Sequence, residues 1–160
     1  MSEGPPATTV ALHEAVAGVA GGPVVLITDS DCLARSVAGP GVIVRDPARA
    51  DSHPDELPRA ALAIVDGAAG FSGESAAIQL VSRLRDCQAE RVVVIAGPGG
   101  GGPLGRQALI GLGFRRWASS HDERGQRRWY AFDLADYKVT PDWLNARHWA
   151  NPELWDKYRW

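Results

Sequence analysis

Four aspartates follow apolar runs that have the composition of buried strands. In an open α/β sheet the carboxyl ends of the strands form the usual ligand crevice. We therefore expect these carboxylates to gather at one edge of a sheet, where they could accept hydrogen bonds from a bound cofactor. They could equally cap the helices that follow the strands, and this role requires no ligand. The candidate cofactor-binding residues are Asp29, Asp31, Asp46 and Asp66.

The same acids are also similar to those of receiver domains, in which carboxylates bind Mg²⁺ and one aspartate is phosphorylated. In that interpretation Asp66 is the acceptor, and Asp29 and Asp31 are metal ligands. The chain departs from the pattern at Ala96, where a receiver domain has a hydroxyl residue. We therefore expect no metal site.

A glycine-rich stretch offers a second chemistry, because Gly97, Gly99 and Gly102 satisfy the pattern GxGxxG between a predicted strand and a predicted helix. Asp122 follows 20 residues later, at the distance of a ribose-binding acid. Two prolines within the run remove amides that a phosphate would need. We expect a flexible crossover loop rather than a phosphate site.

Arginines are concentrated in the segment that follows, interleaved with Trp117 and Trp129. Arginine and tryptophan together can bind single-stranded nucleic acid. However, strand alternation sends neighbouring side chains to opposite faces, and the formal net charge is only −2. We therefore expect a solvated face and no nucleic-acid partner for Arg106, Arg115, Arg116, Arg124, Arg127 and Arg128.

The last 23 residues are the most aromatic part of the chain. Large aromatic side chains dominate the energetics of protein interfaces, so this tail is a candidate for binding another protein. The tail could instead cover part of its own domain, and a homo-oligomer is also compatible with the sequence. The candidate partner-binding residues are Trp143, Trp149, Trp155, Tyr158 and Trp160.

The elements that position these residues alternate between strand and helix. Alternation of this kind predicts a mainly parallel sheet with both faces covered. Two further strands flank the polar turn 121–125 and predict an antiparallel β-hairpin near the end of the domain. The expected strands are 24–28, 42–44, 61–65, 91–96, 114–118 and 128–133, and the expected helices are 9–19, 32–37, 75–87, 104–112, 140–149 and 151–158.

A length of 160 residues fits a single domain. We expect a flexible N-terminus over 1–8, one Rossmann-like α/β domain over 9–137, and a Trp-rich helical tail over 138–160 docked on that domain. No secretion signal or membrane-spanning run is apparent. Cys32 and Cys87 lack the spacing of a metal or redox motif. These features indicate a cytoplasmic protein with no membrane partner.

The C-terminal segment carries the first resemblance to a known family. The runs Tyr137-Lys138-Val139-Thr140-Pro141-Asp142-Trp143-Leu144-Asn145 and Trp149-Ala150-Asn151-Pro152 resemble a family of uncharacterised proteobacterial proteins of about this length. The family has no assigned activity, so the resemblance implies a domain of unknown function.

The order of elements resembles a shortened class I S-adenosylmethionine-dependent methyltransferase. A strand ending in Val65-Asp66, and a helix leading through Leu112-Gly113-Phe114 into a terminal hairpin, carry this resemblance. It implies that Asp46 accepts hydrogen bonds from a ribose and that Asp66 lies beside the methyl donor. The glycine-rich turn of that family is replaced here by residues 28–32.

We therefore expect a non-catalytic binding or protein-interaction module on a degenerate methyltransferase-like fold, with no cofactor. The alternative is a methyltransferase that binds S-adenosylmethionine, or another adenine-nucleotide-binding protein, through Asp46 and Asp66.

Overall fold

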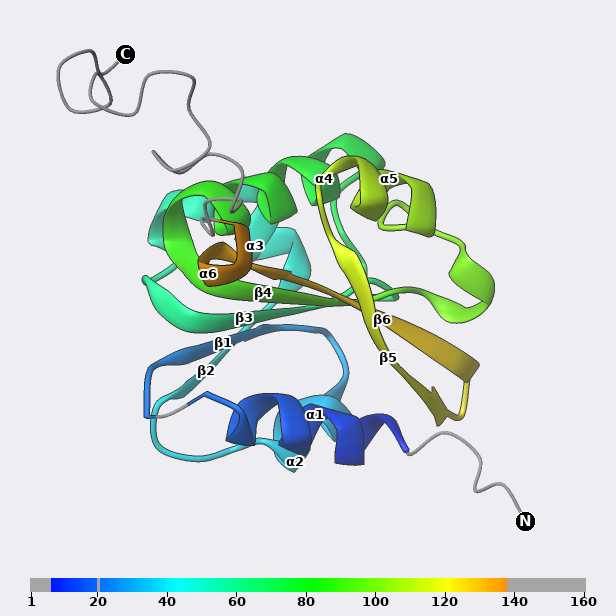
Figure 1. The fold of residues 1–160 in the computed structure, drawn as a ribbon, viewed down its shortest axis with the longest axis horizontal. Helices are drawn as coiled ribbons and strands as arrows, with labels where there is room; N and C mark the ends of the chain where they lie inside the picture. Colours follow the sequence, from blue (N-terminus) through cyan, green and yellow to red (C-terminus); the bar gives the residue numbers. More distant parts are fainter. Residues whose placement is uncertain (1–6, 20, 138–160) are drawn as a thin grey trace, which may run out of the picture.

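The computed structural model describes residues 7–19 and 21–137. Most of the expected flexible N-terminus and the whole of the tail lie outside this range. The helical character of the tail and the five aromatic candidates from Trp143 to Trp160 therefore stay predictions. Figure 1 shows the described part as one twisted sheet with helices on both faces.

The sheet has six strands in the order β2-β1-β3-β4-β6-β5. The four apolar strands pair in parallel, as expected for a Rossmann-like domain, and the two strands of the terminal hairpin run antiparallel. The parallel strands are β1 Val24–Ile27, β2 Val42–Arg45, β3 Ala60–Asp66 and β4 Ala89–Ile95, and the hairpin strands are β5 Arg115–Asp122 and β6 Gly125–Asp133.

Helices cover both faces of the sheet and define two hydrophobic cores (Figure 1). One core lies between the sheet and α1 with α2, and the other lies between the sheet and α3, α4 and α5. No helix within the described ranges has the length and apolar character needed to span a membrane. The helices are α1 Thr8–Ala17, α2 Asp31–Ser36, α3 Pro47–Ser52, α4 Glu74–Arg83, α5 Arg106–Gly111 and α6 Leu134–Tyr137, and a π-helical turn over Leu84–Gln88 continues α4.

Helix α3 forms in the polar connection after β2, where the sequence predicted no regular element. Asp46 is its N-cap, and the Asp46 Oδ1 atom accepts a hydrogen bond from the Arg49 amide at 3.1 Å. Pro47 occupies the first helical position, where its missing amide hydrogen costs nothing. The sequence therefore contained the signal for the start of a helix, an N-cap residue followed by proline. The helix itself is too short for apolar residues to recur at helical spacing.

The hairpin is longer than predicted, because most of the expected turn belongs to the strands. His121 pairs with Gln126, and Asp122 pairs with Gly125, so only residues 123 and 124 form the turn. Gly125 has a φ of +111°, a value that residues with a side chain rarely adopt. The added length brings the hairpin tip to the carboxyl edge of the parallel strands.

Candidate functional site

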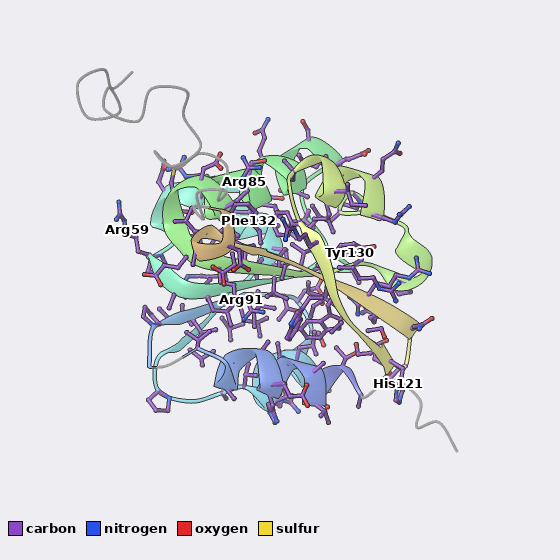
Figure 2. The ribbon with its side chains drawn as sticks, viewed as in Figure 1. Arg59, Arg85, Arg91, His121, Tyr130 and Phe132 are labelled. Carbon is purple, nitrogen blue, oxygen red and sulfur yellow. The ribbon has the colours of Figure 1, made fainter. Side chains whose placement is uncertain are left out.

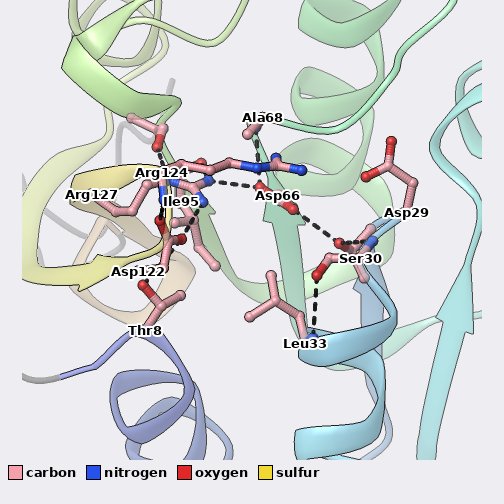
Figure 3. A network of polar contacts seen from close by, with 12 residues as sticks. Thr8, Asp29, Ser30, Leu33, Asp66, Ala68, Ile95, Asp122, Arg124 and Arg127 are labelled. Atoms are coloured by element: carbon pink, nitrogen blue, oxygen red, sulfur yellow. Dashed lines mark hydrogen bonds and ion pairs between the residues drawn. The ribbon is translucent and has the colours of Figure 1, made fainter.

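The carboxyl edge of the sheet is organised around Asp66, the last residue of β3, which is 1% exposed. Its Oδ2 atom accepts a hydrogen bond from the Thr28 hydroxyl at 2.9 Å. Its Oδ1 atom accepts from the Ala68 amide at 3.1 Å and from the Arg127 guanidinium at 2.7 Å. Both carboxylate oxygens are therefore bound by groups of the protein (Figure 3).

Arg127 reaches Asp66 from β6 and is also 1% exposed. Its Nε atom donates to the Ala96 carbonyl at 2.8 Å, and its Nη1 atom forms a second ion pair, with Asp122, at 2.8 Å. A buried charge is tolerated only when it is paired and hydrogen-bonded. Arg127 meets this condition, because its guanidinium is ion-paired and hydrogen-bonded. These contacts also join the ends of β3 and β4 to the hairpin.

A second buried chain of hydrogen bonds ties helix α1 to the same hairpin. The indole of Trp129, which is fully buried, donates to the Ser120 hydroxyl at 2.8 Å. That hydroxyl lies 2.9 Å from the hydroxyl of Thr8, the first residue of α1. The α1 face and the hairpin are therefore joined by polar as well as apolar contacts.

A cavity of about 260 Å³ opens beside this network. Its volume lies just below the roughly 300–1,000 Å³ of typical small-molecule sites. Asp66 and Arg127 form part of its wall, whereas Asp29 and Asp46 do not line it. The other wall residues come from the starts of α1 and α2 and from the hairpin tip, and they include Thr8, Ser30, Cys32, Leu33, Asp122, Glu123 and Arg124.

The other three candidate aspartates are at the same edge but make separate local contacts. The Asp29 carboxylate accepts from the Gly70 amide at 2.9 Å. Asp46 caps α3, as described above. Asp31 is exposed and lies 3.9 Å from Arg35 on the next turn of α2. In the part of the chain that the structure describes, no group of three or more His, Cys, Asp or Glu residues could bind a metal ion.

The prediction of a solvated arginine face is confirmed for five residues and wrong for Arg127. Strand alternation places Arg127 on the same face as Trp129, and Trp129 is fully buried. The spacing of two residues between Arg127 and Trp129 was the available signal that Arg127 is buried. The polar residues on either side of Arg127 instead suggested an exposed strand. The exposed members are Arg106, Arg115, Arg116, Arg124 and Arg128.

The glycine-rich loop folds on itself after β4. A Cβ atom on Gly97 would lie 2.7 Å from the Gly101 carbonyl oxygen, so this glycine permits a close approach within the loop. The Gly100 amide donates to the Gly97 carbonyl at 3.0 Å. Asp122, the acid that the GxGxxG pattern would assign to a ribose, is ion-paired with Arg127 instead.

The strand order, the parallel body and the terminal antiparallel hairpin define a Rossmann-like α/β domain. The chain belongs to a family of unknown function (DUF6231), whose model matches residues 6–160. The expectation of an uncharacterised family that covers nearly the whole chain is therefore confirmed.

Comparison with curated proteins finds no match. Among solved structures, the chain is similar to the crystal structure of magnesium protoporphyrin IX methyltransferase from Synechocystis PCC 6803 with bound SAM. The identity is 14%, the similarity covers 76% of this chain and 75% of that chain, and the TM-score is 0.48.

Proposed function

We propose that this protein is a non-catalytic binding or protein-interaction module on a shortened methyltransferase-like fold. The observation that carries the proposal is the ion pair between Asp66 and Arg127, with each side chain 1% exposed. A cofactor that used Asp66 would meet a carboxylate that already accepts three hydrogen bonds, one of them from a guanidinium that is itself bound to three other protein groups. Separating such a buried pair leaves an uncompensated charge and is strongly unfavourable.

The neighbouring groups also fit a bound S-adenosylmethionine poorly. The Ser30 amide, in the turn that replaces the glycine-rich turn of methyltransferases, donates to the Thr28 hydroxyl at 3.0 Å. Asp46 has one carboxylate oxygen engaged as the cap of α3. The polar groups at this edge therefore serve the fold, which supports a protein that needs no cofactor.

The alternative is an active S-adenosylmethionine-dependent methyltransferase or another adenine-nucleotide-binding protein. One observation favours it, namely that the 260 Å³ cavity opens at the edge of the sheet where ligands usually bind. In this alternative Asp46 and Asp66 contact the cofactor, and of the four candidate aspartates Asp66 lines the cavity.

Calorimetric titration of the full chain with S-adenosylmethionine and S-adenosylhomocysteine separates the two proposals. We expect no heat of binding from the folded protein. Micromolar binding that Asp46→Ala removes would overturn the non-catalytic proposal. The Asp46→Asn variant serves as the control for folding, because asparagine is as good an N-cap as aspartate.

The partner of the proposed module is another protein, contacted through Trp143, Trp149, Trp155, Tyr158 and Trp160. These five aromatic side chains are of the types that dominate interface energetics. The test compares affinity capture by the full chain with capture by a variant in which all five are alanine. A partner retained equally by both would contradict this role for the tail.

The proposal includes a cytoplasmic location. The two cysteines, Cys32 and Cys87, are free and exposed. Exposed thiols persist in reducing compartments, whereas oxidising ones favour disulfides.

A further inference from the structure

The carboxyl ends of β1 and β3 form the topological switch point of the sheet. These strands are parallel neighbours, but α2, which follows β1, packs in one hydrophobic core, and α4, which follows β3, packs in the other (Figure 1). The two connections therefore diverge, and the crevice between such connections is where open α/β sheets usually bind ligands. The walls of this crevice are residues 28–30 and residues 67–73.

The two walls of the crevice are hydrogen-bonded to each other. The Thr28 hydroxyl donates to the Asp66 carboxylate at 2.9 Å in a buried contact. The Gly70 amide donates to the Asp29 carboxylate at 2.9 Å in an exposed contact. Figure 3 shows Asp29 on the opposite side of Asp66 from Arg127. The walls are therefore joined both at the base of the crevice and at its surface.

A second carboxylate holds the loop between β3 and α4 at a point two residues further along. The Ser72 amide donates to Asp51 Oδ2 at 2.6 Å, and the Ser72 hydroxyl donates to Asp51 Oδ1 at 2.7 Å. Asp51 belongs to α3, which follows β2, so the loop reaches from β3 past β1 to the helix beyond. Between these two attachments, Phe71 packs against the core on the α4 side of the sheet.

The backbone of residues 68–72 contributes little to holding this loop in place. Within the described ranges it bonds to other backbone groups only locally, from the Ala69 amide to the Asp66 carbonyl and from the Phe71 amide to the Ala69 carbonyl, each at 3.1 Å. The polar contacts with elements other than β3 are the exposed ones to Asp29 and Asp51. Segments that are held by few apolar contacts and by exposed hydrogen bonds open locally at a low free energy.

The cavity of about 260 Å³ lies in a different part of this edge. Its wall includes the starts of α1 and α2 and the hairpin tip, where Figure 2 shows His121. Neither Asp29 nor any of residues 68–72 lines it. The loop therefore controls access to the switch-point crevice and not to this cavity.

We infer that residues 68–72 form a flap that closes the switch-point crevice, and that Asp29 and Asp51 are its latch. When the two carboxylates release the flap, it opens as a unit while the sheet stays folded. A ligand of this crevice must first open the flap, so its apparent affinity is lowered in proportion to the fraction of open molecules. The inference concerns the state of the crevice and not a ligand, so it does not rest on the proposed function.

The test is amide hydrogen exchange of the ¹⁵N-labelled full chain, measured by NMR without any ligand. The Asp29→Ala/Asp51→Ala variant removes the latch. The Asp31→Ala/Asp55→Ala variant is the matched control, because it removes two exposed aspartates that are ion-paired with arginines outside the flap.

The informative amides are those of Ala69 and Phe71, whose hydrogen bonds do not involve either latch carboxylate. We expect their exchange to be about tenfold faster or more in the latch variant and unchanged in the control. The Gly67 amide, which donates to the Ile95 carbonyl, reports on the sheet itself. Its exchange should be unchanged in both variants.

Three results would overturn the inference. Faster exchange confined to Gly70 and Ser72 would show that the loop does not open as a unit. An equal increase at Gly67 and throughout β1 would show that the latch variant loosens the whole domain, so that no separate flap exists. An equal increase at Ala69 and Phe71 in the control variant would indicate a general effect of removing surface charge.

Discussion

Arg127 is the residue on which the account of the site depends. It reaches across from β6 and neutralises Asp66, at a point where a carboxylate without a partner would be costly. A solvent-exposed arginine would contribute little, because most surface ion pairs contribute about 0–1 kcal/mol. The difference between Arg127 and the exposed Arg128 beside it is therefore a difference in burial and pairing.

Replacement of Arg127 by methionine should lower the free energy of unfolding by about 3–5 kcal/mol, because it leaves Asp66 buried and unpaired. The Asp66→Asn/Arg127→Met double variant should lose much less, since neither charge remains. Arg128→Met, at an exposed position, should change stability by about 0.5 kcal/mol or less. Urea unfolding of the three variants measures these differences, and equal costs for Arg127→Met and Arg128→Met would refute the role assigned to Arg127.

At this scale the sequence predicted the edge of the sheet on which the aspartates lie, but not their partners. Asp66 was expected at a strand end and is there. Its partner is 61 residues away in the chain, and no local pattern encodes so distant a contact. The only local clue was the spacing of two between Arg127 and the buried Trp129.

At the scale of elements, the chain just beyond Asp66 packs closely against the end of β4. A Cβ atom on Gly67 would lie 2.6 Å from the Ile95 carbonyl oxygen. The Gly67 amide also donates to this oxygen at 2.7 Å. The position of Asp66 therefore depends on the absence of a side chain at the next residue.

Gly67→Ala should destabilise the protein by about 1–3 kcal/mol, because the added methyl group must push the two strands apart. Gly111→Ala is the matched control, since Gly111 lies in α5 and a Cβ atom added there would meet open space. That substitution should stabilise by about 0.4–1 kcal/mol through the unfolded state. Thermal unfolding measures both changes, and a stabilising Gly67→Ala would contradict the close approach.

The alternation of strands and helices was predictable because each apolar strand is bounded by clear turn signals. Element type was correct for the four parallel strands, the hairpin and the helices that became α1, α2, α4 and α5. Helix α3 was missed, because six residues give too short a pattern to reveal a helical period. The hairpin strands were predicted too short, because polar residues at an exposed edge resemble a turn.

At the scale of the whole molecule, the described residues contain two cores, one on each face of the sheet. Their buried members among the described residues run from Ala11 to Phe132. The division of the chain into a domain over 9–137 and a docked tail over 138–160 is our proposal, as is the binding of a partner by the tail.

Removal of residues 138–160 should leave a folded protein, because the described residues already contain a hydrophobic core on each face of the sheet. We expect far-ultraviolet circular dichroism of an α/β protein and a single cooperative thermal transition, with Tm lowered by a few degrees if the tail docks on the domain. A truncated chain without a cooperative transition would show that the tail completes the core.

We propose that protein groups, rather than a cofactor, satisfy the hydrogen-bonding side chains at the carboxyl edge of the sheet. The most direct measurement is titration of the ¹⁵N-labelled full chain with S-adenosylhomocysteine, followed through the amide resonances of Ser30, Gly67 and Gly70. We predict that these resonances do not move at millimolar ligand, because the Thr28, Asp66 and Arg127 contacts remain closed. Saturable shifts at these three amides would contradict the account and favour the methyltransferase alternative.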